Sequence, residues 1–158
     1  MAKNFGLYGE RTGCVSFVTE SEKEAAIISS RVKQIARPMY SNPPIHGARI
    51  VDIILSDAEL TAQWHGSLKT MSSRMTSMRS GLVAKLKDAG SEHDWSHVTS
   101  QIGMFAYTGL NTEQVTKLQT DAGIFMTMDG RISIAGLNTG NLDYIAESFH
   151  QVTKDTGL

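Results

Sequence analysis

The sequence has few of the features that mark secreted, membrane-spanning or nucleic-acid-binding proteins. Cys14 is the single cysteine among 158 residues, which excludes an internal disulfide and favours a reducing compartment. No apolar run is long enough to cross a bilayer, and none follows Lys3 as a signal peptide requires. The formal net charge is -1, without a run of Lys or Arg, so we expect neither a nucleic acid nor a membrane as a partner.

What is present is the composition of an ordinary globular protein. Apolar residues make up 41% of the chain and charged residues 20%, which is typical of a folded domain rather than a disordered one. The length allows one domain with a buried core. Composition alone therefore supports a globular fold and says little about activity.

Local signals predict a strand, a helix and a stiff connector in the first third of the chain. The short β-branched run Cys14–Val18 predicts a strand. Ser21 and Glu24 have capping-box spacing at the start of an apolar helical pattern. We expect Pro38 to end this helix and to push Arg37 out of helical conformation. The stretch RPMYSNPPIHG is then an extended, stiff connector.

The longest periodic signal predicts one helix over residues 57–89, with Gly90 as its C-terminal cap. We interpret its Met-rich stripe as packing material rather than a cofactor site, and we expect only half of it to be covered. The same helix divides the chain into a front part, 1–56, and a compact part, 57–158. The stripe comprises Leu60, Trp64, Leu68, Met71, Met75, Met78, Leu82 and Leu86.

Mixed signals follow in the last third. Residues 102–107 predict a strand, and Asn111 with Gln114 predicts a capping box at the start of a helix. The segment 123–136, with its Asp-Gly turn, predicts a hairpin. Asn141 is placed to cap a final amphipathic helix. The order is therefore strand, helix, hairpin, helix.

Two pairs of side chains invite a functional reading that we do not adopt. His93 and His97 stand four residues apart, but no further ligands lie at metal-binding spacing, so we expect no metal. Trp64 and Trp95 are assigned to packing.

Four cationic side chains lie beside turn or strand-end signals: Lys3, Arg11, Arg37 and Arg131. A lysine amine can act as a covalent nucleophile, and a guanidinium matches a carboxylate or a phosphate with two parallel hydrogen bonds. The set suits a small polyanionic ligand. The alternative that each is a solvated surface charge stays open on the residues alone.

Four longer motifs go further. The runs AKNFGLYGER, RPMYSNPPIHGAR, QIGMFAYTGL and DGRISIAGLN, in this order, resemble the aspartate aminotransferases, fold-type I enzymes that depend on pyridoxal phosphate. The resemblance implies an α/β fold, of which this chain carries an α+β portion. That portion is the last part of the large domain with its dimer arm (1–56), joined by the long helix to the small C-terminal subdomain (57–158).

The resemblance also implies roles for five residues. Lys3 matches the lysine that forms a Schiff base with the cofactor and shuttles the substrate proton. Arg11 matches the arginine that pairs with the cofactor phosphate. Arg37 and Arg131 match the arginines that bind the distal and α-carboxylates of the substrate, and Arg37 reaches the neighbouring subunit's site. Phe105 matches an aromatic that lines the substrate pocket.

The resulting expectation is reversible transfer of an amino group between aspartate and 2-oxoglutarate, by a homodimer. Tyr8, on the lysine loop, is expected only to pack. In the family, the aspartate at the pyridine nitrogen, the ring-stacking aromatic and part of the phosphate cup come from a preceding region, so we expect this chain alone to be inactive. Two alternatives stay open: a non-catalytic interaction module, and an aromatic amino acid aminotransferase. We expect a soluble protein of the cytoplasm or the mitochondrion.

Overall fold

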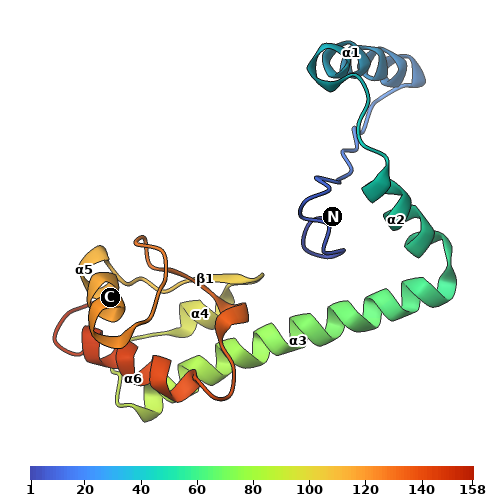
Figure 1. Ribbon diagram of the computed structural model, residues 1–158. Coiled ribbons are helices and arrows are strands. Elements are labelled where there is room, and N and C mark those ends of the chain that lie inside the picture. Colours follow the sequence, from blue (N-terminus) through green and yellow to red (C-terminus); the bar gives the residue numbers. More distant parts are fainter. The chain divides into compact units, whose positions relative to one another are not determined.

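The computed structural model describes residues 1–158, and its helices and two strands are labelled in Figure 1. The chain divides into two compact units, 1–68 and 69–158, and the boundary lies inside α3. The division expected at residues 56 and 57 stays a prediction. The elements are α1 (Glu22–Tyr40), α2 (His46–Ser56), α3 (Ala58–Asp88), α4 (Ser96–Ser100), β1 (Phe105–Tyr107), α5 (Thr112–Ala122), β2 (Arg131–Ser133), the 3-10 turn η1 (Ile134–Gly136) and α6 (Leu142–Thr153).

The first unit contains α1, whose start is confirmed and whose end differs from the prediction. The Ser21 hydroxyl accepts a hydrogen bond from the backbone N–H of Glu24 at 3.2 Å, as the capping spacing predicted. The expectation that Pro38 ends the helix is wrong, because α1 continues to Tyr40. Proline removes one backbone donor, and the carbonyl it leaves belongs to exposed Gln34, where water can satisfy it.

The strand predicted for Cys14–Val18 is absent. This segment has no regular secondary structure, and its apolar side chains face solvent, with Phe17 59% exposed. A strand needs a neighbour to hydrogen-bond with, and this unit offers none. The apolar face of α1 is likewise uncovered, because none of its residues is buried.

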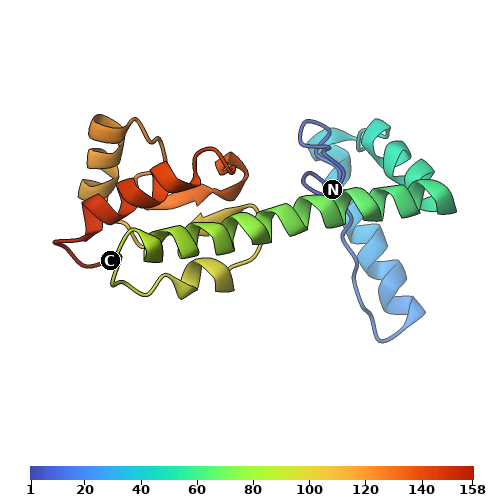
Figure 2. The ribbon, with the colours of Figure 1, turned by 90° about the horizontal axis from the view of Figure 1, so that it is seen from below.

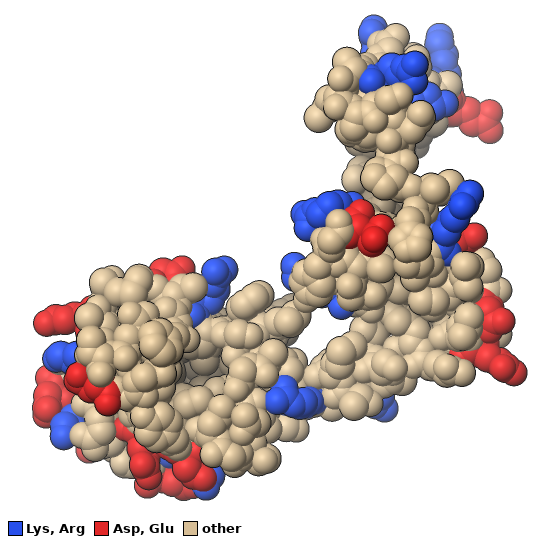
Figure 3. Space-filling view, in the orientation of Figure 1, with Lys and Arg blue, Asp and Glu red and all other residues tan.

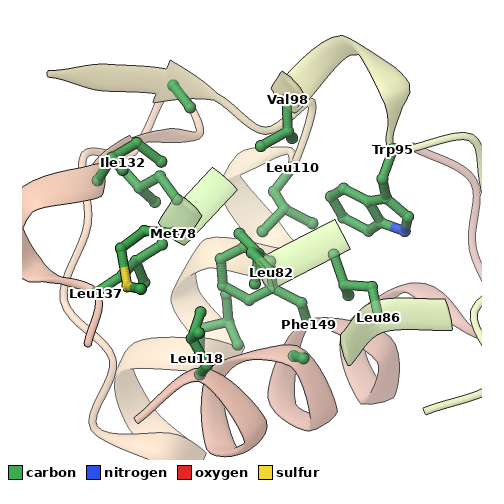
Figure 4. Packing of buried hydrophobic residues seen from close by; sticks show 14 of the residues in the cluster. Met78, Leu82, Leu86, Trp95, Val98, Leu110, Leu118, Ile132, Leu137 and Phe149 are labelled. Atoms are coloured by element: carbon green, nitrogen blue, oxygen red, sulfur yellow. The ribbon is translucent and has the colours of Figure 1, made fainter. Parts of the chain in front are cut away.

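In the second unit the C-terminal half of α3 forms one wall of the core (Figure 4). Leu82 and Leu86 are fully buried there, whereas Leu60 and Met71, earlier in the same stripe, are 37% and 50% exposed. The expectation of a half-covered stripe is confirmed. The buried cluster consists of Met78, Leu82, Leu86, Trp95, Val98, Ala106, Leu110, Val115, Leu118, Ile132, Ile134, Leu137, Leu142, Ala146 and Phe149.

The end of α3 is confirmed as well. Gly90 has φ +87°, and the N–H of Ser91 donates to the carbonyl of Leu86 at 3.0 Å, which is the Schellman pattern. Figure 2 shows α6 beside this half of α3. An ion pair of 2.7 Å between Lys85 and Asp143 joins the two helices.

The small sheet pairs strands that the sequence did not pair. β2 is antiparallel to β1, with Phe105 opposite Ser133 and Tyr107 opposite Arg131, so the predicted 123–136 hairpin is wrong. The segment before the Asp-Gly turn forms no strand: the Ile124 N–H donates to the carbonyl of Leu118 in α5 at 2.9 Å, and one backbone bond crosses the turn, from the Thr127 N–H to the Arg131 carbonyl at 3.2 Å. The bond to α5 takes up the Ile124 N–H, and a single bond across the turn is too little for a strand ladder.

The caps of the last two helices have different outcomes. Asn111 and Gln114 form the predicted capping box, in which each side chain accepts a hydrogen bond from the other residue's backbone N–H. Asn141 stands at the N-cap of α6, but its side chain makes no capping bond. Its amide oxygen accepts from the N–H of Asn138 at 2.8 Å, so the preceding turn uses the cap group.

Gly130 occupies a position that no other residue fits. Its φ is +84°, and an added Cβ would overlap the carbonyl oxygen of Leu110. Thr108 fixes this approach, because its N–H and hydroxyl both donate to the Gly130 carbonyl, at 3.0 and 2.7 Å. The turn before β2 therefore depends on glycine.

Replacing Gly130 by alanine tests this dependence. Positive φ and the clash with backbone predict that Gly130→Ala lowers the free energy of unfolding by at least about 2 kcal/mol. The measurement is urea unfolding of the chain followed by circular dichroism. Gly136→Ala is the matched control, since a Cβ there meets nothing within 4 Å, and it should change stability by less than about 0.5 kcal/mol. Equal, small effects of both substitutions would contradict this account of the turn.

Candidate active site

Lys3 lies in the N-terminal loop of the first unit, with its side chain exposed. Its carbonyl closes a tight turn by accepting a bond from the Gly6 N–H at 3.3 Å. The residues that follow are held by α3: the Trp64 indole N–H donates to the carbonyl of Asn4 at 2.8 Å, and its ring stacks on Phe5 at 4.5 Å. The turn that carries the lysine is therefore anchored to a helix, as the packing role assigned to Trp64 requires.

Tyr8 connects Lys3 with Arg11 in the same loop. The Lys3 Nζ lies 5.2 Å from the centre of the Tyr8 ring, within range of a cation–π contact. The Arg11 Nη1 donates to the Tyr8 carbonyl at 3.2 Å. Sequence reasoning gave Tyr8 a packing role only. The structure makes it the link between an amine and a guanidinium.

The far end of this loop packs tightly against α2. Gly47 is buried in the first turn of α2, and an added Cβ there would overlap the side chain of Thr12 and lie 2.9 Å from the Cβ of Glu10. Arg11, between these two residues, has φ +52°, a conformation that is uncommon outside glycine. The close approach of loop and helix thus fixes the unusual backbone that presents this arginine.

Arg37 stands apart from the other predicted site residues: it belongs neither with Lys3 and Arg11 in the N-terminal loop nor with Arg131 and Phe105 in the second unit. It stands in the last turn of α1, with its side chain exposed. Its Nη1 donates to the hydroxyl of Ser41 at 2.8 Å, and its carbonyl accepts the Ser41 N–H at 3.1 Å. The guanidinium is therefore held locally at the helix end.

Arg131 and Phe105 come together in the second unit. Both lie on the exposed face of the β1–β2 sheet, while Ala106 and Ile132 point into the core. The Arg131 guanidinium carbon lies 5.2 Å from the centre of the Phe105 ring. These residues occupy diagonal positions across the strand pair, where long and aromatic side chains meet. The two residues assigned to the substrate thus share one surface.

Asp129 supports the backbone of Arg131 without forming an ion pair with its guanidinium. Its carboxylate accepts a short hydrogen bond from the Thr127 hydroxyl and a 3.2 Å bond from the Arg131 N–H. The first of these bonds contributes most to lowering the pKa of the Asp129 carboxyl. The one ion pair of the structure is between Lys85 and Asp143, so the Arg131 guanidinium carries no paired carboxylate.

Arg79 is a buried cation that sequence reasoning missed. It is 4% exposed, and its guanidinium donates to the carbonyls of Val98, Gly103 and Phe105 at 2.7, 3.0 and 2.6 Å. Burial lowers its pKa from the usual arginine value. The sequence did offer one indication that Arg79 is buried, because it lies three residues before Leu82 and so on the same face of the helix.

The surface elsewhere offers no comparable constellation. Both signs of charge occur on the visible face of each unit (Figure 3). No group of three His, Cys, Asp or Glu side chains could hold a metal ion. His93 and His97 instead bond to backbone carbonyls, of Thr153 at 2.9 Å and of Thr108 at 3.0 Å. No helix combines the length and apolar character needed to traverse a bilayer.

Comparison with known sequences gives consistent matches. The family described as "Aminotransferase class I and II" matches residues 1–149. The mitochondrial aspartate aminotransferases of Dictyostelium discoideum and Arabidopsis thaliana are 53% and 50% identical over 98% of this chain. In both cases the chain spans only 36% of the relative's length.

Solved structures agree. A mitochondrial aspartate aminotransferase from Trypanosoma brucei matches with a TM-score of 0.92 and 49% identity, over 96% of this chain and 40% of that one. An aromatic amino acid aminotransferase from Burkholderia pseudomallei, covalently bound to pyridoxal phosphate, matches with a TM-score of 0.92 and 46% identity, over 96% of this chain and 38% of that one. These neighbours confirm the predicted fold-type I origin and the α/β class.

One explanation accounts for the four motifs, for the lysine and arginine on one loop, and for the matches along nearly the whole length. The chain belongs to the class I and II aminotransferases.

Proposed function

We propose that this chain supplies part of the active site of an aspartate aminotransferase that depends on pyridoxal phosphate. The reaction is reversible transfer of an amino group between aspartate and 2-oxoglutarate. The observation that carries the proposal is the identity of about half of all residues with enzymes named for this activity, together with the Lys3–Tyr8–Arg11 arrangement. Because the chain spans 36% of those relatives, the activity belongs to a larger assembly.

The donor set of the N-terminal loop fits pyridoxal phosphate. The cofactor presents an aldehyde, which an amine attacks, and a phosphate dianion, which a guanidinium fork binds. Lys3 and Arg11 offer one of each on a single loop, and no acidic side chain forms an ion pair with either. We assign Lys3 to the aldehyde and Arg11 to the phosphate. When bound, pyridoxal phosphate supplies an electron sink for the substrate α-carbon.

Lys3 has a second role in this proposal. Once its amine is free of the cofactor, it accepts the proton from the substrate α-carbon and returns it later in the reaction. A general base must reach the proton that it moves, and an unbranched lysine on an anchored turn meets that need. Tyr8 limits where the amine goes, because the Lys3 Nζ rests over its ring.

The arginines select a dicarboxylic substrate. Arg131 binds the α-carboxylate, beside the Phe105 ring, and Arg37 binds the distal one. A guanidinium can hold each carboxylate through two parallel hydrogen bonds. A substrate with one carboxylate offers no partner to Arg37, so it lacks one charge-assisted pair and binds more weakly.

The rest of the site must come from elsewhere. The resemblance implies that the acidic partner of the cofactor's ring nitrogen and the aromatic stacked on the ring lie in regions without a counterpart here. It also implies a homodimer in which Arg37 serves the neighbouring site. The relatives' names favour a mitochondrial location, with the cytoplasm as the alternative.

An aromatic amino acid aminotransferase is the second candidate. The relative from Burkholderia pseudomallei is 46% identical, close to the 49% of the aspartate enzyme from Trypanosoma brucei. The resemblance implies that enzymes of both classes share the four motifs, Lys3 included. Rates with aspartate and with phenylalanine, measured on the complete assembly, separate them.

The cofactor assignment predicts a spectral signal. The chain mixed with pyridoxal phosphate should develop an absorbance band that Lys3→Ala lacks, because the band requires the Lys3 amine. Lys87→Ala is the matched control, since this exposed lysine lies at the end of α3, and the band should persist there. A band of equal strength in Lys3→Ala, or no band in any variant, would leave the chain as a non-catalytic interaction module.

The incomplete site predicts little turnover by the chain alone. With aspartate, 2-oxoglutarate and pyridoxal phosphate present, oxaloacetate formation should not exceed that of Lys3→Ala. The reason is that the cofactor works as an electron sink only while its ring nitrogen has an acidic partner. The measurement is coupled reduction of oxaloacetate by malate dehydrogenase and NADH. Turnover that depends on Lys3 would show that these residues form a complete site.

A further inference from the structure

Arg79 is a buried cation without an acidic partner. Its side chain is 4% exposed, and the one ion pair of the structure lies elsewhere, between Lys85 and Asp143. An unpaired buried charge is costly to keep, so the three carbonyls that surround it must compensate for the lost water. A group held at such cost is expected to fix something that matters.

The three carbonyls that Arg79 binds belong to the segment that leads into β1. They belong to Val98 in α4, to Gly103 in the connecting turn and to Phe105, the first residue of the strand. The bond to the Phe105 carbonyl is the shortest of the three, at 2.6 Å. Gly103 has φ +90°, a conformation that glycine adopts readily, so the turn can bring this carbonyl to Arg79.

At this end of the strand one backbone bond accompanies the Arg79 contacts, from the Ile134 N–H to the carbonyl of Met104 at 2.8 Å. β1 and β2 have three residues each, and a two-stranded pair of that length is only marginally stable in water. The far end of β1 is fixed by Gln101, whose side chain accepts the Tyr107 N–H at 2.7 Å and donates to the Tyr107 carbonyl at 2.9 Å. At the near end, Arg79 donates to the backbone carbonyl of Phe105, whose ring lies against Arg131.

We propose that Arg79 is a positioning residue, which holds Phe105 where its ring orients the Arg131 guanidinium toward the substrate carboxylate. The part that concerns the substrate rests on the proposed function. The part that concerns geometry does not: contacts run from the Arg79 guanidinium to the Phe105 carbonyl, and from the Phe105 ring to the Arg131 guanidinium carbon, 5.2 Å from the ring centre. Arg131 has no ion pair of its own to orient it.

The chain offers a matched control on the same helix. Arg74, in α3, donates from Nη2 to the carbonyl of Leu137 at 2.6 Å. It therefore also ties α3 to a backbone carbonyl of the second unit. None of its bonds reaches β1. A substitution that removes the Arg74–Leu137 hydrogen bond therefore shows what general loosening of the second unit does to the Phe105–Arg131 contact.

The experiment is solution NMR of the complete chain in four forms: unsubstituted, Arg79→Lys, Arg74→Lys and Phe105→Leu. Lysine keeps the charge but cannot span three carbonyls, because it lacks the planar fork of arginine. The readouts are the cross-peak between Phe105 ring protons and Arg131 side-chain protons, and the ring-current shift of Arg131. Phe105→Leu gives the unshifted position. Neither readout needs cofactor or turnover, so failure of the proposed function is detected separately.

We expect Arg79→Lys to lose the cross-peak and to move the Arg131 signals to their Phe105→Leu positions. Arg74→Lys should keep both the cross-peak and the shift, even where thermal unfolding shows a comparable loss of stability. Retention of the contact in folded Arg79→Lys, or equal loss in Arg74→Lys, would overturn the proposal.

A second measurement covers the case in which Arg79→Lys does not fold. In the unsubstituted chain, urea is raised to concentrations below global unfolding, and the protected Arg79 guanidinium protons are followed beside the Phe105–Arg131 cross-peak. The two should disappear together. A cross-peak that survives loss of the Arg79 protection would overturn the proposal.

Discussion

Burial of one half of a single apolar stripe is the constraint on which the second unit depends. Leu82 and Leu86 are fully buried in the core, which is what fixes the C-terminal half of α3. With that half fixed, the neighbouring Arg79 meets the entry to β1. The other half of α3 has Leu60 and Met71 exposed and carries no residue of the core, and its contact is with the N-terminal loop through Trp64.

The two pairs of candidate residues reflect two ways of holding a functional side chain. Lys3 and Arg11 lie on a loop that is held by the hydrogen bond from Trp64 and by the close approach of the loop to α2. Arg131 lies on a strand whose backbone is fixed by Gly130 and by the contacts of β1. In the proposed function, the loop presents the cofactor ligands and the strand presents a substrate ligand, and backbone contacts fix both positions.

The sequence predicted the features that are encoded locally. The capping box of Asn111 and the Schellman end of α3 need only residues a few positions apart, and both are present. Features that depend on distant partners were predicted poorly: Cys14–Val18 has the pattern of a strand but no neighbour, and β2 pairs with β1 instead of the segment beside it in sequence. The site residues came from motif resemblance, and Arg79 escaped because its partners are carbonyls, which no sequence pattern displays.

The most direct test of the central claim is whether Lys3 and Arg11 act together on one cofactor. The chain is incubated with pyridoxal or pyridoxal phosphate and reduced with borohydride, and the modification of each lysine is measured by mass spectrometry. We predict that Lys3 is modified above every other lysine and prefers the phosphorylated form by about tenfold, the effect of a charge-assisted bond. Arg11→Gln should abolish that preference. Uniform modification, or an unchanged preference in Arg11→Gln, would contradict the account.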